Sequence, residues 1–346
     1  MLLPAEWEQQ KALWLTWPQN ADTWTPVWEE AKAAYKEIIR VARRCQDVVL
    51  LVNDQSLRER LEKELNANPL DRAPSEKGFR LDVLVCPTND SWIRDYGAIT
   101  VRATNGIISA SSKLVTLDFT FNSWGGKYPP WDKDDAVPVF MAQRRERELC
   151  PVNFVLEGGS IDANGQGQLL TTTQCLLNPN RNPGLGRGEI EEVLHGYLGI
   201  TQTLWLESGI NGDDTDGHVD DLARFSDART ILCAVETDAS DENYRPLKAN
   251  IEALNRYART VDLEVVEIPM PLRQEKAGLR TPATYLNFLI LNGVVLVPVF
   301  RDRRDDHTLQ VFEKRFPDRR IVPVDCRSLV FGQGAIHCSS MQEPDG

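Results

Sequence analysis

Cys338 is the residue of this sequence best placed to act as a nucleophile. It follows the segment GQGAIH, in which Gly332 and Gly334 leave the backbone open to the close approach of a ligand. A thiol presented in this way can attack an electrophilic carbon once it is a thiolate. The structural alternative is a buried cysteine that follows a core strand at residues 328–331.

Three further segments contain the acidic and imidazole groups that such a nucleophile needs. These segments are NDSWIRDYG at 89–97, LEGGS at 156–160 and GDDTDGHVDD at 212–221. The first two leave apolar runs, and polar side chains at strand ends often form sites in α/β proteins. In an extended strand, His218 and Asp220 of the third segment would point to the same side. Local ion pairs, solvated turns and helix caps are the structural alternatives for these acids. A calcium loop is another, but the spacing differs from the EF-hand pattern.

Together these segments offer one thiol, one imidazole and three carboxylates, namely Cys338, His218, Asp95, Glu157 and Asp220. The chain lacks the G-x-S-x-G pattern of a serine hydrolase, and a cysteine protease has no use for so many acids. Carboxylates beside a thiol raise its pKa unless the substrate brings positive charge. A guanidinium group is a permanent, planar cation whose N–H groups bind carboxylates in pairs. The residues therefore favour a small cationic guanidine as the substrate.

The composition limits the partners and the location of the protein. Its 346 residues carry a net charge of -12, which argues against nucleic acid as a partner because phosphate binding requires a basic surface. An acidic surface favours cationic small molecules, although many proteins are acidic for solubility alone. Seven scattered cysteines without a CxxC pair indicate neither a disulfide framework nor a zinc site. They are typical of a reducing compartment, and no signal peptide or membrane span is indicated, so we predict a cytoplasmic protein.

Short apolar runs alternate with amphipathic stretches along the chain, which predicts a mixed α/β architecture. The Asn292-Gly293 pair between two apolar runs predicts a β-hairpin. Because no low-complexity linker interrupts the chain, we expect a single domain over residues 1–346. The predicted helices are 27–44, 55–66, 188–198, 243–259 and 306–316. The predicted strands are 48–52, 81–85, 106–111, 153–158, 168–173, 203–208, 229–235, 263–269, 320–325 and two within 288–300.

Four motifs, TNDSWIRDYG, LEGGSID, DDTDGHVDD and GQGAIHCSS, resemble in order and spacing those of the agmatine deiminase and bacterial peptidylarginine deiminase family, within the guanidine-modifying or pentein superfamily. PAEWEQQKALWLTWP near the start and the loop FNSWGGKYPPWDKDD are also similar to that family, so the resemblance extends over nearly the whole chain. It implies a single deiminase domain folded as a five-bladed, pseudo-symmetric α/β-propeller of ββαβ modules. It implies neither a metal nor an organic cofactor.

The resemblance implies a role for each of five residues. Cys338 would attack the guanidinium carbon, and Asp95 and Asp220 would bind the guanidinium nitrogens. His218 would be the general acid for the departure of ammonia and then the base that activates water. Glu157 would orient His218 and keep it protonated. The reaction would pass through a tetrahedral adduct and a covalent thiouronium intermediate to a ureido product.

The resemblance favours agmatine as the substrate, with N-carbamoylputrescine and ammonia as products and a role in putrescine and polyamine biosynthesis. Trp92 would pack against the substrate, Asp214 would bind its distal ammonium and Gly334 would allow its close approach. The family's motif commonly reads three glycines, Asn, Ile, His and Cys. Here Gln333 and Ala335 replace two of these residues, so the choice of substrate stays open.

Three alternatives to agmatine deimination remain. The first is a deiminase of peptidyl-arginine or of another substituted guanidine. The second is an inactive propeller that binds a cationic ligand, although a binding module has no need of the thiol. The third is a metal-dependent hydrolase built on the acids of DDTDGHVDD. Members of the family are often homo-oligomers, and Trp24, Trp28 and Trp131, which we expect at the surface, would be available for such contacts.

Overall fold

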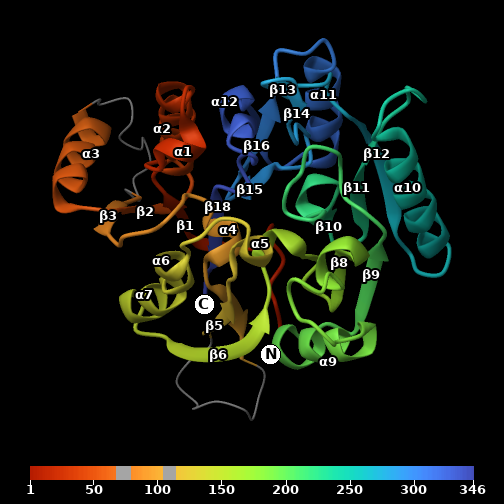
Figure 1. Ribbon diagram of the computed structural model, residues 1–346, viewed down its shortest axis with the longest axis horizontal. Helices are drawn as coiled ribbons and strands as arrows, with labels where there is room; N and C mark the ends of the chain where they lie inside the picture. Colours follow the sequence, from red (N-terminus) through yellow and green to blue (C-terminus); the bar gives the residue numbers. More distant parts are fainter. Residues whose placement is uncertain (68–78, 104–113) are drawn as a thin grey trace.

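Five mixed β-sheets, each built by the same order of elements, form most of the structure (Figure 1). The computed structural model describes residues 1–67, 79–103 and 114–346. In each sheet an antiparallel pair of strands is joined, through a helix, to a further strand that runs parallel to the second. The predicted mixed α/β class is therefore confirmed.

Four of the sheets are contiguous in the sequence. Their strands are β4 (Ile99–Arg102), β5 (Leu114–Thr120) and β6 (Glu148–Val155); β7 (Asp162–Ala163), β8 (Gln168–Thr172) and β9 (Gln202–Leu206); β10 (Ala223–Asp227), β11 (Thr230–Val235) and β12 (Glu264–Pro269); β15 (Leu289–Leu291), β16 (Val294–Val299) and β17 (Arg320–Asp325). The crossover helices are α7 (Val137–Arg144), α9 (Arg187–Leu198), α10 (Tyr244–Ala258) and α11 (Asp305–Arg315).

The fifth sheet joins the two ends of the chain. Its strand order is β18 (Ser340–Pro344), β1 (Gln10–Thr16), β2 (Asp47–Val52) and β3 (Leu81–Val85), with α2 (Trp28–Ala42) and α3 (Gln55–Ala67) as its crossover helices. β2 lies between two parallel neighbours, and residues 48–52 are all buried. A parallel strand covered on both faces requires an unbroken apolar run, which VVLLV provides.

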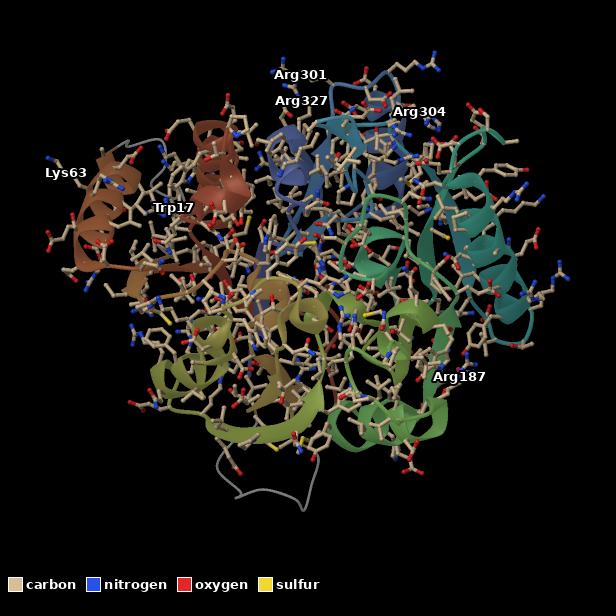
Figure 2. All side chains as sticks on the ribbon, viewed as in Figure 1. Trp17, Lys63, Arg187, Arg301, Arg304 and Arg327 are labelled. Carbon is tan, nitrogen blue, oxygen red and sulfur yellow. The ribbon has the colours of Figure 1, made fainter. Side chains whose placement is uncertain are left out.

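The crossover helices bury one face each. In α2 the buried side chains include Ala31, Ala34, Tyr35 and Ile38, which recur at intervals of three and four residues. Charged side chains lie at the periphery, as Lys63 and Arg187 show, whereas Trp17 lies inside the molecule (Figure 2). Among the helices of the described residues, none combines the length and apolar character that crossing a bilayer requires.

The short elements and the remaining hairpin connect these sheets. The hairpin consists of β13 (Glu275–Lys276) and β14 (Leu279–Arg280). The short helices are α1 (Ala21–Trp24), α4 (Ile93–Tyr96), α5 (Ser123–Gly126), α6 (Asp132–Asp135), α8 (Thr173–Leu176) and α12 (Arg327–Phe331), with 3-10 turns η2 (Gly158–Ser160) and η3 (Val219–Asp221).

Most of the predicted elements are confirmed, with ends that differ by a few residues. The five predicted helices correspond to α2, α3, α9, α10 and α11, and Leu291 pairs with Val294 across the Asn292-Gly293 turn as expected. The predicted strand at 106–111 lies outside the described residues. The sequence analysis missed β1, β4, β5, β7, β10, β13, β14 and β18, whose mixed polar and apolar residues or short length gave a weak pattern.

One expectation about this framework is wrong, and one alternative does not apply. The alternative of a core strand before Cys338 does not apply because residues 328–331 belong to the helix α12, whose apolar side chains Leu329 and Val330 are buried and which packs on α2. Trp24 was expected at the surface but is fully buried, where its ring lies 5.3 Å from that of Trp92. Trp28 and Trp131 are half-buried.

We predict that Phe312→Ala destabilises the fold by about 3–5 kcal/mol, because it leaves a cavity in a packed core. Phe312 is fully buried in α11, with its ring 5.0 Å from that of Phe288 and 6.1 Å from that of Phe316. Equilibrium urea unfolding measures the change. The control is Leu279→Ala, because Leu279 is 74% exposed and its truncation should change stability by less than about 0.5 kcal/mol. Equal effects for the two variants would contradict the packing argument.

Candidate active site

The predicted site residues occupy equivalent places in the five repeated units. Each lies in the short segment that precedes the first strand of its sheet: Asp95 before β4, Glu157 before β7, Asp220 before β10 and Cys338 before β18. The fifth such segment, before β15, contributes Asn287, which the sequence analysis did not select. Since α4 packs on η2 and η2 packs on η3, these segments meet and bring residues distant in sequence together.

Gly159 marks the point where three of these segments meet. A Cβ atom on Gly159 would lie 2.6 Å from Nδ1 of His218, 2.8 Å from Oδ1 of Asp95 and 3.2 Å from Oδ2 of Asp220. The backbone N–H of Gly159 also donates to Oδ1 of Asp95 at 3.0 Å. Only glycine fits at this position. Because glycine has no side chain, the imidazole and both carboxylates can lie close together.

Asn287 holds the thiol of Cys338. Its Nδ2 lies 3.0 Å from Sγ, and its Oδ1 accepts from the backbone N–H groups of His337 and Cys338 at 2.9 and 3.2 Å. Sγ lies 3.7 Å from Oδ2 of Asp220. Burial, together with the negative charges of Asp220, Asp221 and Asp95, raises the pKa of the Cys338 thiol well above its usual value. The thiol is thus protonated at neutral pH while the site holds no cation.

Asp220 has one oxygen bound and one free. Oδ2 lies 2.7 Å from Nδ1 of His337 and 3.3 Å from Nδ2 of Asn287, whereas Oδ1 is buried with no hydrogen-bond partner within the described ranges. Burial opposes ionisation, but the hydrogen bond and charge of His337 lower the pKa of Asp220 below its usual range. Asp220 is therefore an oriented carboxylate with an oxygen available to a ligand.

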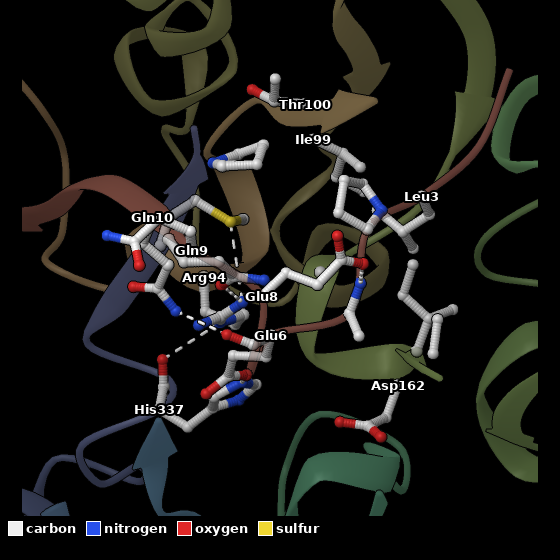
Figure 3. A pocket seen from close by; sticks show the side chains of 18 residues that line it. Leu3, Glu6, Glu8, Gln9, Gln10, Arg94, Ile99, Thr100, Asp162 and His337 are labelled. Atoms are coloured by element: carbon white, nitrogen blue, oxygen red, sulfur yellow. Dashed lines mark hydrogen bonds and ion pairs between the residues drawn. The ribbon is translucent and has the colours of Figure 1, made fainter. Parts of the chain in front are cut away.

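His337 is a functional position that the sequence analysis noted only as the neighbour of Cys338. Its Nε2 lies 2.9 Å from Oε2 of Glu6, so the ring bridges Glu6 and Asp220. Figure 3 shows Glu6 between Arg94 and His337 in a small cavity of about 60 Å³, next to the N-terminal segment. Glu6 also pairs with the buried Arg224. The only sequence signal for this contact was the acidic residue within PAEWEQQ.

His218 is fully buried between acidic groups. Its Nδ1 lies 3.6 Å from Oδ1 of Asp95, and its ring approaches Glu157 and Cys175 so that one ligand atom of each lies within 4.8 Å of the others. Burial alone would lower the pKa of His218, but Asp95, Cys175 and Glu157 raise it well above its usual value. His218 is therefore an imidazolium at neutral pH. Cys175, within α8, was not selected from the sequence.

Two expectations about these segments need correction. The stretch from His218 to Asp220 is not an extended strand, because residues 219–221 form the 3-10 turn η3. Glu157 makes no hydrogen bond to His218 among the described contacts. Its Oε1 instead lies 2.6 Å from Nε of Arg181, and its Oε2 is buried without a partner. Glu157 thus acts on His218 through its charge, while Arg181 fixes its position.

A cavity of about 700 Å³ opens on Cys338 and Asp95. Trp92, Trp124 and Asp214 also line it, so the loop at 122–136 contributes a wall of the cavity. Nε1 of Trp124 donates to Oδ2 of Asp95 at 2.9 Å. Burial and the charges of Asp220 and Glu157 raise the pKa of Asp95 to about 6, although His218 and this hydrogen bond oppose the shift.

Gly334 and Trp92 shape the wall beside the thiol. A Cβ atom on Gly334 would lie 2.6 Å from Cζ3 of Trp92 and 2.9 Å from Cβ of Cys338. Gly334 therefore allows the indole and the thiol to lie side by side. Asp214 lies on the same cavity, but the hydroxyl of Tyr128 donates to its carboxylate and the ammonium of Lys127 donates to its carbonyl oxygen.

The acids of residues 213–216 mainly stabilise their own loop. Asp213 accepts from the backbone N–H groups of Thr215, Gly217 and His218, and Asp216 pairs with Arg181 and Lys127. These contacts occupy the oxygens that a calcium loop would need. Two buried groups within the described residues have the spacing of metal ligands: Glu157, Cys175 and His218, and Asp220, Asp221 and Cys338. A soft divalent ion at either would occupy His218 or Cys338 and block thiol chemistry.

The fold of the chain is shared with distantly related proteins of known structure. It aligns with a dimethylarginine dimethylaminohydrolase with a TM-score of 0.52 and 12% identity over 96% of this chain, and with an amidinotransferase from Microseira wollei with a TM-score of 0.51 and 10% identity. Likeness at this level of identity reflects the shared pentein fold alone. The five mixed sheets of the chain are those of this fold.

The chain belongs to the Porphyromonas-type peptidyl-arginine deiminase family, which includes the agmatine deiminases, since the sequence model of that family matches residues 2–344. It is 34% identical to the agmatine deiminase of Pseudomonas fluorescens, over 99% of this chain and 95% of that relative. A Cys-to-Ser variant of a C. jejuni agmatine deiminase with substrate bound is 36% identical, with a TM-score of 0.88 over 100% of this chain and 97% of that one. The Enterococcus faecalis agmatine deiminase has a TM-score of 0.89 at 30% identity, over 99% and 96% of the two chains.

We predict that Arg181→Met lowers the free energy of unfolding by about 3–5 kcal/mol, because it leaves the buried carboxylate of Glu157 without its counter-ion. Both side chains of this pair have zero exposure. The matched control is Arg315→Met, which removes an equally short but exposed pair with Glu264 and should cost less than about 1 kcal/mol. Urea titrations of both variants measure the difference. A loss below about 1 kcal/mol in Arg181→Met would contradict the argument.

Proposed function

We propose that this protein deiminates agmatine to N-carbamoylputrescine and ammonia, with Cys338 as the nucleophile. The observation that carries the proposal is the arrangement of the thiol, which opens on a cavity beside the carboxylate of Asp95 and lies 3.7 Å from the carboxylate of Asp220. These negative charges attract a cation, and a guanidinium carries its electrophilic carbon at the centre of the cation. The relatedness to agmatine deiminases over the full chain supports the same reaction class.

Substrate binding would activate the nucleophile. The free Oδ1 of Asp220 and the carboxylate of Asp95 would accept from the guanidinium nitrogens, and the cation would lower the pKa of the nearby thiol. Asn287 Nδ2 holds Sγ in place from the opposite segment. The thiolate would then attack the guanidinium carbon to form a tetrahedral adduct. The thiol proton passes to solvent, and the ammonia released in the next step takes up one proton there to become ammonium.

His218 would serve both halves of the cycle. As an imidazolium it donates a proton to the amino group, which leaves as ammonia and produces a thiouronium bound to Cys338. The neutral imidazole then takes a proton from water as the water attacks the same carbon. Collapse of the second adduct breaks the C–S bond, returns the thiol and releases the ureido product. The charges of Asp95 and Glu157 keep His218 cationic at the start of each cycle.

The finer assignments belong to the same proposal. We infer one deiminase domain over residues 1–346, with the five sheets arranged as a pseudo-symmetric propeller around the site. Trp92 and Trp124 offer aromatic walls to the alkyl chain of the substrate, and Asp214 offers a carboxylate farther along the cavity. Peptidyl-arginine is the second candidate substrate, because a cavity of about 700 Å³ exceeds what agmatine fills.

The proposal is tested by incubating the protein with agmatine, and separately with a peptide that carries an internal arginine, and by measuring ureido product and ammonia. We expect equimolar products from agmatine, unaffected by EDTA and absent in Cys338→Ala. The control is Cys150→Ala, a half-buried cysteine on β6, which should retain turnover. Turnover of the peptide alone would move the assignment to peptidyl-arginine. Product formed by Cys338→Ala, or silence on both substrates, would refute the proposed chemistry.

The pH dependence provides a second test. Because Asp95 must be ionised to bind the cation and its pKa is about 6, kcat/KM for agmatine should fall as the pH drops below about 6. Trp124→Phe removes a hydrogen bond that favours the ionised carboxylate, so the acid limb should move up by about half a pH unit or more. The control is Trp205→Phe, whose Nε1 donates to Glu191 away from the site. If the acid limb does not move in Trp124→Phe, the ionisation of Asp95 does not determine that limb.

A further inference from the structure

Gln333 has a backbone conformation that disfavours its residue type. Its φ is +82°, within the left-handed region that glycine adopts readily and residues with a Cβ do not. Gly332 and Gly334 flank it, yet both have negative or extended φ values, so the unfavourable conformation falls on the one residue of the three with a side chain. A non-glycine residue in this region often indicates a functional constraint on the side chain.

The side chain of Gln333 has a second unfavourable feature. It lines the same cavity as Cys338, Trp92 and Asp214, and its Oε1 is buried without a hydrogen-bond donor in reach among the residues that the structure describes. A buried acceptor without a partner destabilises the folded chain. A ligand with an N–H group in the cavity would supply the donor that this acceptor lacks.

The other acceptor expected for the distal ammonium is already engaged. The carboxylate of Asp214 accepts from the hydroxyl of Tyr128, and Lys127 places a competing ammonium on the carbonyl oxygen of the same residue and on Asp216. A second cation at Asp214 would meet the positive charge of Lys127. Gln333 offers a neutral oxygen on the wall of the same cavity, and unlike the carboxylate of Asp214 this oxygen accepts no hydrogen bond within the described residues.

We propose that Gln333 is a specificity-determining residue whose Oε1 accepts a hydrogen bond from the distal ammonium of the substrate. This inference rests on the proposed deimination and narrows its substrate class to aliphatic guanidines that carry a second N–H cation. Gly334 lets the backbone lie close to Trp92, and Gln333 beside it lines the cavity on which Cys338 opens. The guanidinium itself is bound by Asp95 and Asp220.

The test compares agmatine with butylguanidine, which lacks the ammonium, in the wild type, Gln333→Met and Gln333→Gly. Gln333→Met keeps the bulk and the strain but removes the oxygen. We expect both variants to raise KM for agmatine about 10-fold or more with little change in kcat, and to leave KM for butylguanidine within about 2-fold. Neither variant should lower Tm, because each removes a buried acceptor without a partner. The matched control is Glu146→Gly, which relieves a left-handed residue outside the cavity and should leave both KM values unchanged.

The outcomes distinguish the role of Gln333 from the proposed deimination on which it rests. A KM that rises equally for agmatine and butylguanidine would overturn the assignment to the ammonium, because the oxygen would then act on the guanidinium or on the shape of the cavity. An unchanged KM for both substrates would overturn the role of Gln333 altogether. Absence of turnover by the wild type on both guanidines would refute the proposed deimination itself. No result with the Gln333 variants alone would lead to that conclusion.

Discussion

The structure depends on the burial of several negative charges at the point where its five units meet. Asp95, Glu157 and Asp220 are almost or wholly inaccessible to water, and an isolated carboxylate in such a place would be strongly destabilising. Asp95 accepts from Trp124 and Gly159, Glu157 pairs with Arg181, and Asp220 is bound by His337 and Asn287. The oxygens left over, Oε2 of Glu157 and Oδ1 of Asp220, face the interior without partners in the described chain. The framework therefore holds the acids in place and leaves their charge incompletely compensated.

The repeated order of elements explains how such a centre can be assembled. Each unit enters its first strand from the middle of the molecule, so five short segments supply side chains to one small volume. The two ends of the chain are held together by strand pairing, because β1 and β18 are neighbours in one sheet. Gly159 then decides how closely the segments can approach, because any side chain there would displace His218 and both carboxylates. Function at the centre thus relies on a backbone position as much as on the titratable groups.

Much of this could be predicted from local sequence, and the remainder could not for identifiable reasons. VVLLV predicted a doubly covered strand and Asn292-Gly293 predicted a hairpin, because both signals are contained in a few neighbouring residues. The motifs located Cys338, Asp95, Glu157, His218 and Asp220, which the structure brings together. Asn287 and Cys175 carry no motif, and the contact of His337 with Glu6 joins residues at opposite ends of the chain. A core strand at 328–331 and an extended backbone at 218–220 were considered from the sequence, because a short apolar or alternating run does not distinguish a strand from a single helical turn.

In the proposed reaction, the raised pKa of Cys338 makes the site selective for cations. A thiol surrounded by Asp220, Asp221 and Asp95 stays protonated, and so resists adventitious alkylation and oxidation, until a cation enters. The same charge that binds the substrate then creates the nucleophile, so neutral molecules of similar shape are neither held nor attacked. The ureido group of the product is neutral, and once it forms, the carboxylates lose their counter-ion and the thiol recovers its proton. Binding, activation and release therefore follow from one quantity, the uncompensated negative charge that the five converging segments bury.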